Sequence, residues 1–81
     1  MNQKGKTADE KLLIRIYEMA AAKGDLYAEI SVEKAATSLG QRKTAASTIV
    51  KHLAQANLVK KGEEGYVALT RGGIQWVEGQ K

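Results

Sequence analysis

The fold is decided by residues 43–69, which read KTAASTIVKHLAQANLVKKGEEGYVAL. Apolar side chains in the first half of this stretch recur with the spacing of one helix face. They are Ala46, Ile49, Val50 and Leu53. We therefore expect an amphipathic helix that starts at Lys43 and ends at Asn57, because asparagine tolerates the left-handed backbone that closes a helix.

The second half of the same stretch predicts a β-hairpin. LVKK (58–61) and YVAL (66–69) read as strands, and GEEG (62–65) reads as the loop between them. A lone hairpin is only marginally stable in water, so this one must pack on helices.

A first amphipathic helix is expected over residues 8–23. Acids stand at its start and a lysine at its end, which is the arrangement that the helix dipole favours. Residues 1–7 are interpreted as a flexible basic arm and residues 8–81 as one domain. The apolar residues of this helix share helical spacing and are Leu12, Leu13, Ile16, Tyr17 and Ala20.

A connector and a second helix lie between the first helix and the central stretch. Residues 25–30 (DLYAEI) alternate apolar and polar side chains over a span too short for a helix, so we expect a short strand or an extended connector. Ser31 then precedes VEKAATSLG, where its hydroxyl can cap a helix that runs to about Leu39 and stops at Gly40.

A short last helix is expected after Thr70, a residue type that caps helices. Ile74 and Val77 would face the core, and Trp76 would lie on another side at a step of about 100° per residue. Two interpretations of Trp76 stay open: an exposed anchor for association, or a ring that folds over the first helix and completes the core. The whole pattern predicts a mostly α fold with a small β-hairpin.

Positive charge is concentrated in the middle of the chain. The net charge is +4, yet residues 34–62 contain no carboxylate, and the segments on either side are each slightly acidic. Charge gathered in this way suits a polyanion. The cations of this segment are Lys34, Arg42, Lys43, Lys51, Lys60 and Lys61.

Composition excludes several classes of function. The chain has no cysteine and one histidine, His52, which excludes disulfides, thiolate nucleophiles and the usual zinc ligand sets. His52 and Ser47 form no catalytic pair, because they point in different directions on a helix and lack an oriented third group. We expect no enzyme and no cofactor. The polar N-terminal residues are followed by no apolar run, so we also expect no membrane segment and a cytoplasmic, nucleoid-associated location.

The order helix, short strand, helix, helix, hairpin, helix resembles the winged helix-turn-helix domains of bacterial and archaeal transcription regulators over about residues 8–78. ISVEKAATSLG (30–40) is similar to the family's first helical element, with Ala36 at the small position where two helices touch. STIVKHLAQANLVKK (47–61) resembles the recognition helix running into the first wing strand, and YVALTRGG (66–73) resembles the wing exit. The resemblance implies a three-helix core, a wing of two or three strands and a short C-terminal helix.

The resemblance further implies a small transcriptional regulator that binds double-stranded DNA, with the helix over 43–57 in the major groove and the wing at the backbone or minor groove. The side of this helix opposite its apolar row is polar, with cations nearby that suit phosphates. It has no arginine or asparagine at its centre, so strong sequence discrimination is not visible, and a merely solvated face is the open alternative. The candidate DNA-binding residues are Gln41, Arg42, Lys43, Thr44, Ser47, Thr48, Lys51, Gln55, Lys60 and Lys61.

The predicted wing tip departs from a phosphate-binding design. It carries Glu63 and Glu64, and DNA phosphates repel carboxylates. The tip is interpreted either as a solvated turn that stays out of the groove or as a contact with a protein partner. The alternative function is therefore a winged helix that serves as a protein-interaction module or subunit. A homodimer through the first and last helices, with Trp76 at the contact, is the second partner considered.

Overall fold

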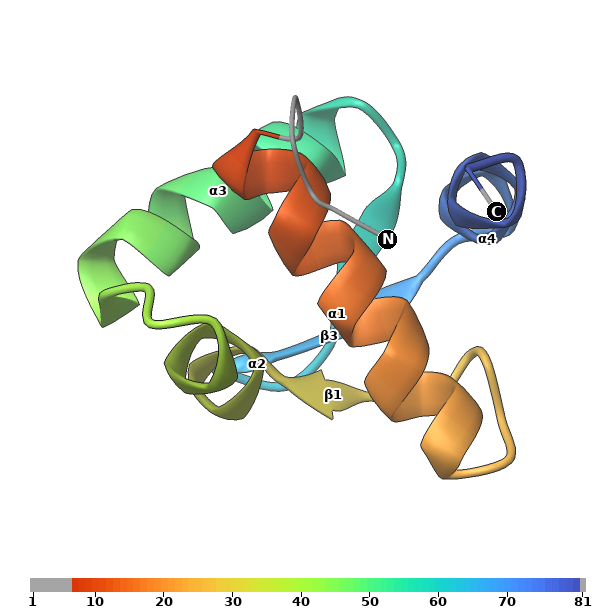
Figure 1. Ribbon diagram of the computed structural model, residues 1–81, viewed down its shortest axis with the longest axis horizontal. Coiled ribbons are helices and arrows are strands. Elements are labelled where there is room, and N and C mark those ends of the chain that lie inside the picture. The colour runs from red at the N-terminus through yellow and green to blue at the C-terminus, as the bar shows by residue number, and fades with distance from the viewer. Residues whose placement is uncertain (1–6, 81) are drawn as a thin grey trace.

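The computed structural model describes residues 7–80. These residues form four helices and a three-stranded antiparallel sheet, which confirms the mostly helical class with a small hairpin. α1 crosses the front of the molecule, with α2 and α3 on one side, α4 on the other and the strands behind it (Figure 1). The elements are α1 (Ala8–Ala22), β1 (Ile30–Ser31), α2 (Val32–Ser38), α3 (Lys43–Gln55), β2 (Val59–Lys61), β3 (Tyr66–Leu69) and α4 (Arg71–Glu78).

The start of α1 is held by a reciprocal pair of hydrogen bonds. The Glu10 N–H donates to the Thr7 hydroxyl (3.2 Å), and the Thr7 N–H donates to the Glu10 carboxylate (3.0 Å). This capping box satisfies two amides that the helix itself leaves free. Residues 1–6 of the predicted arm lie outside the described residues, whereas Thr7 is part of the capping structure of α1.

The segment after α1 differs from the prediction. A strand or extended connector was expected over residues 25–30, but within this range only Ile30 is in a strand, and residues 26–28 form a turn and a bend. The Asp25 side chain accepts from the Tyr27 N–H (2.9 Å), and the Asp25 carbonyl accepts from the Ala28 N–H (3.0 Å). An aspartate that bonds the backbone two residues ahead stabilises a turn, and this local chemistry overrides the alternating pattern.

The three strands form one sheet in the order β1-β3-β2. In the β2–β3 hairpin, Val59 pairs with Leu69 and Lys61 pairs with Val67, and β1 adds the pair Ile30 and Val67 on the other edge of β3. Asn57 has the predicted left-handed backbone, with φ at 63°, and it turns the chain from α3 into β2. The hairpin is therefore tied directly to the end of α3.

The entry into α4 depends on close backbone packing. The Thr70 hydroxyl accepts from the Gly73 N–H (3.0 Å) and donates to the Asn57 carbonyl (2.6 Å), so the predicted cap also binds the chain before β2. A Cβ atom at Gly73 would overlap the carbonyl of Leu58. Glycine is needed at this position because the neighbour is backbone and cannot move aside as a side chain can.

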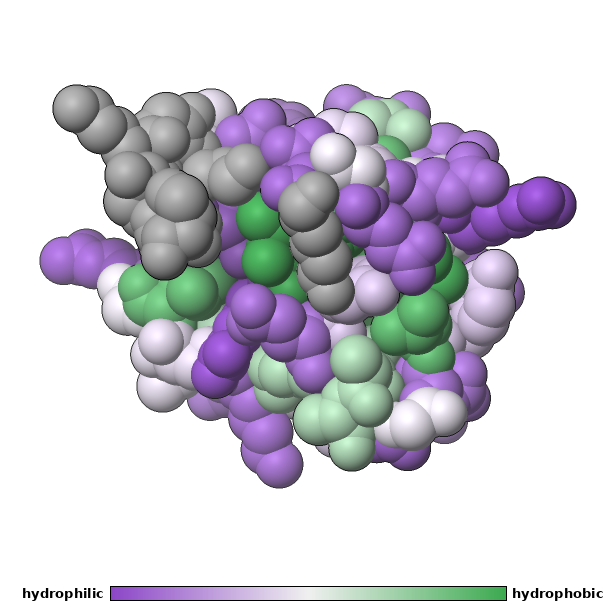
Figure 2. Space-filling model, turned by 45° about the vertical axis from the view of Figure 1, so that its right-hand side comes forward, coloured by the Kyte–Doolittle hydropathy of each residue, from purple (hydrophilic) through white to green (hydrophobic). Residues whose placement is uncertain are grey.

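The core lies where α1 meets every other helix and two of the strands. The predicted inward faces are confirmed, since the apolar rows of α1 and α3 are buried. Small residues let the helices approach closely: Ala20, Ala35, Ala36 and Ala46 are each at most 1% exposed. On the side shown in Figure 2, hydrophilic side chains cover most of the visible surface, and hydrophobic ones form small separate patches. No helix within residues 7–80 is long and apolar enough to cross a bilayer.

Candidate nucleic-acid interface

α3 has one buried side and one exposed polar side. Its 13 residues form slightly more than three turns, and the buried residues are the four predicted from spacing. The residues on the opposite side are polar and exposed, and they recur at the spacing of one helix face. These are Thr44, Ser47, Thr48, Lys51 and Gln55. The structure therefore brings five of the ten candidate residues onto one helix face.

Two further candidates stand at the N-terminal end of α3. Arg42 is the N-cap residue but its side chain makes no capping hydrogen bond, and Lys43 begins the helix. Both are exposed, and neither forms an ion pair with any residue within 7–80. The helix dipole is positive at this end, so the two cations add to a potential that already attracts anions.

An open groove of about 290 Å³ separates α3 from the β2–β3 hairpin. Lys51 reaches it from α3 and Lys61 from β2, and neither ammonium group pairs with a carboxylate of the described residues. The buried Val50 and Val67 lie at its base, and Ser47 adds a hydroxyl beside Lys51. The groove thus offers cations from two consecutive elements, α3 and β2, that form no ion pair within residues 7–80.

The two lysines of β2 are on opposite faces of the sheet. Side chains alternate along a strand, so Lys61 shares the inner face with the buried Val59, and Lys60 lies on the outer face with its partner Ala68. In agreement, Lys61 lines the groove and Lys60 does not. Both lysines were predicted to contact phosphates, and the sheet geometry places only Lys61 in the groove.

The acidic hairpin tip borders the same groove. Glu63 and Glu64 are exposed and line it together with the two lysines, so the formal charge of the groove is close to zero. The tip has a fixed position, because the Gly65 carbonyl accepts from the Val32 N–H (2.9 Å) at the start of α2. Any anion that enters the groove therefore meets attraction from Lys51 and Lys61 and repulsion from the tip.

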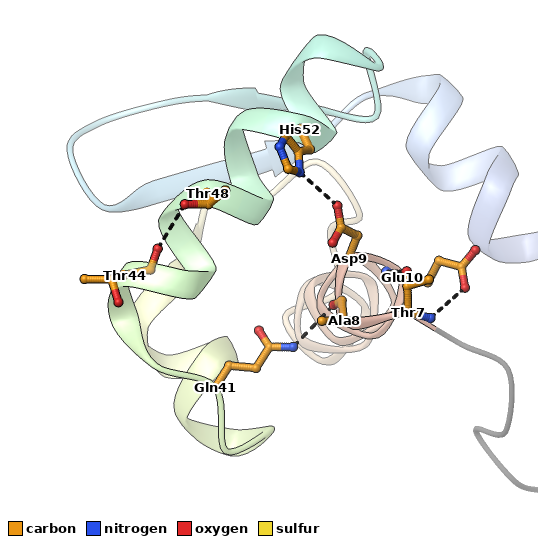
Figure 3. Close-up of polar contacts among 8 residues, drawn as sticks. All are labelled: Thr7, Ala8, Asp9, Glu10, Gln41, Thr44, Thr48 and His52. Carbon is orange, nitrogen blue, oxygen red and sulfur yellow. Dashed lines mark hydrogen bonds and ion pairs between the residues drawn. The ribbon is translucent and has the colours of Figure 1, made fainter.

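Two polar side chains, Gln41 just before α3 and His52 within it, contact α1 (Figure 3). The Gln41 amide nitrogen donates to the Ala8 carbonyl (3.3 Å), and the Gln41 amide oxygen is buried. The His52 Nδ1 atom lies 3.3 Å from the Asp9 carboxylate. Gln41 was a candidate for DNA contact, and the structure sets it apart from the others. No local signal marks this bond, because its partners are 33 positions apart.

The hydroxyl of Thr48 is also engaged within the protein. It donates to the Thr44 carbonyl one turn earlier (3.3 Å). Figure 3 shows both threonines on a different side of α3 from His52, with Thr44 pointing away from α1. Thr48 therefore offers a methyl group and an acceptor oxygen on the exposed side, while Ser47 keeps its donor.

Trp76 lies away from this surface. It is half-buried, packs against the core and lines a second cleft, of about 420 Å³, together with Leu13 of α1 and Leu53 of α3. This position favours the interpretation in which the indole ring completes the core beside the first helix. Part of the ring stays accessible from the cleft, whose rim includes Asp9 and Glu10.

Comparisons of the chain with protein-family models, with curated proteins and with solved structures found no match. Among residues 7–80, no group of three or more histidine, aspartate or glutamate side chains is arranged to hold a metal ion.

Proposed function

We propose that the chain is a winged helix protein that binds duplex DNA, with α3 in the major groove and the β2–β3 hairpin beside the phosphate backbone. One observation carries this proposal: four exposed cations that form no ion pair with any of residues 7–80 surround the polar side of α3. They are Arg42, Lys43, Lys51 and Lys61.

The dimensions of this surface agree with such a role. A helix of 13 residues is about 20 Å long, and a B-DNA major groove admits one α-helix across its width of about 12 Å. Arg42 and Lys43 would meet phosphates at one end of the helix. Lys51 and Lys61 would meet the strand that runs through the groove between α3 and the hairpin. Short side chains on the exposed face between Lys43 and Lys51 would let the helix approach the bases closely.

Fluorescence anisotropy with a labelled duplex tests the proposal. Each neutralised phosphate contributes about −0.9 to the slope of log K against log salt, so four contacts predict a slope of about −4. The folded state of the protein is checked by circular dichroism in each buffer. A folded protein that gives no anisotropy change at low salt contradicts duplex binding.

A role in protein contact is the second candidate, and the cleft at Trp76 is the observation that favours it. An aromatic side chain at an accessible cleft suits a binding anchor. Light scattering over a range of protein concentrations, with indole emission measured in parallel, tests self-association through α1 and α4. A mass that stays monomeric while the emission stays blue-shifted contradicts a homodimer at this cleft and agrees with a core role for Trp76.

A further inference from the structure

The side chains that read base pairs best are nearly absent from the exposed side of α3. Specific contacts in the major groove are made mostly by arginine or lysine to guanine and by asparagine or glutamine to adenine, each as a pair of hydrogen bonds. On α3 and directly before it, the side chains with a planar polar group are Gln41, Arg42 and Gln55, and His52 adds an imidazole. Their placement decides how much sequence information the protein extracts.

Two of these four side chains, Gln41 and His52, contact α1. Gln41 donates its amide to the Ala8 carbonyl, and its oxygen is buried. His52 faces Asp9 on α1. The Gln41 bond also joins the start of α3 to α1, so releasing Gln41 for a base contact would break a contact between the two helices.

The two remaining groups lie at opposite ends of α3. Arg42 precedes the first turn and Gln55 ends the last, about 20 Å away along the axis. A straight helix that enters a curved groove near one end leaves it at the other, so at most one of these side chains reaches base edges. Lys51 lies in the groove beside the hairpin, opposite Lys61, where a phosphate strand rather than a base would run.

Between Lys43 and Lys51, the exposed side of α3 presents only short side chains. Thr44, Ala45, Ser47 and Thr48 are all exposed, and Thr48 already donates its hydroxyl to Thr44. Hydroxyl groups bond to several bases without strong preference, and methyl groups select only for the thymine methyl. Such a surface fits against many sequences and rejects few.

We infer that the partner is duplex DNA of largely unrestricted sequence, so that the protein coats or shapes DNA instead of selecting one operator. This inference rests on the proposed function and narrows it. One base-reading side chain distinguishes sites by at most about 150-fold, whereas proteins that select operators reach about 10³-fold to 10⁷-fold over non-specific DNA. Affinity comes mainly from the cations, whose phosphate contacts are the same on every sequence.

Selection of bound duplexes from a random pool tests the inference, followed by anisotropy with the most enriched duplex and with a scrambled duplex of equal composition. Both are measured with the full chain at one salt concentration. We expect the two dissociation constants to differ by less than about 150-fold, the limit for a single base-reading side chain. A larger ratio overturns the inference but leaves duplex binding intact. Absence of binding to both duplexes overturns the proposed function itself.

Discussion

The two flanks of α3 differ in what they bind. Toward α1, the helix is fastened by a buried apolar row and by the polar contacts of Gln41 and His52. Toward the hairpin, the described residues leave an open groove in which Lys51 and Lys61 have no partner. One helix thus has a flank that fixes its position and a flank that stays available.

The largest effect is expected on the fixed flank. Ile49 is buried in the core, and replacing it with alanine should lower the free energy of unfolding by about 2 to 5 kcal/mol, because a cavity forms. Chemical unfolding followed by circular dichroism measures this loss. Lys51→Ala is the matched control, two positions away on the exposed side, and should change stability by less than about 0.5 kcal/mol. Equal losses in the two variants would contradict the assignment of the two flanks.

The next effect separates the two lysines of β2. Lys61→Ala should weaken duplex binding roughly tenfold at about 0.1 M salt and reduce the salt slope by about one, because one phosphate contact is lost. Lys51→Ala should act in the same way from the other wall of the groove. Lys60→Ala is the matched control, since this side chain lies on the opposite face of the sheet. Anisotropy salt series on the three variants provide the measurement.

If Lys60→Ala weakens binding as much as Lys61→Ala does, DNA does not lie in the groove between α3 and the hairpin. The outer face of the sheet would then have to be part of the interface.

A smaller effect of opposite sign is expected at the hairpin tip. Replacing both Glu63 and Glu64 with glutamine should raise DNA affinity, by less than about 1 kcal/mol per charge, because exposed charges near a phosphate are screened by solvent and salt. The salt slope should steepen only slightly, since neutral glutamine adds no phosphate contact. Titration of the double variant at low salt measures the gain. An unchanged affinity would show that the tip stays away from DNA.

The smallest effect is expected at the polar contact between α1 and α3. His52 and Asp9 are 60% and 39% exposed, and exposed ion pairs contribute at most about 1 kcal/mol. His52→Ala should therefore lower stability by less than this amount, as measured by chemical unfolding, and leave duplex affinity unchanged. A clear loss of DNA binding with normal stability would place His52 in the interface and would weaken the division between the flanks.

Most of the secondary structure could be predicted from local sequence. The apolar rows of α1 and α3, the caps at Ser31 and Thr70, and the left-handed Asn57 are all where spacing and residue type placed them. Each depends on a few neighbouring residues, and such signals are visible in a single chain. The predicted strand or extended connector over residues 25–30 was wrong for most of its length. The Asp25 side chain accepts a hydrogen bond from the Tyr27 N–H and stabilises a turn, which competes with the alternating pattern.

The candidate site was predictable only in part. The exposed side of α3 follows from helical periodicity once its buried side is known. That Lys60 and Lys61 point to opposite faces follows from alternation along the predicted strand, but the structure decides which of them faces α3. Two other features needed the assembled structure: the groove between α3 and the hairpin, and the hydrogen bond from Gln41 to α1. Both join residues from different elements, and local propensity carries no information about such contacts.

By itself, the sequence of this protein determined its elements and where its positive charge is concentrated, because hydrophobic spacing, capping residues and composition act over short distances along the chain. The tertiary structure decided which of those charges and polar groups stay free. Packing α1 against α3 engages Gln41 and His52, and pairing β2 with β3 directs Lys61 into the groove and Lys60 away from it. The physical reason is that a side chain becomes available or engaged only when distant elements fix its surroundings.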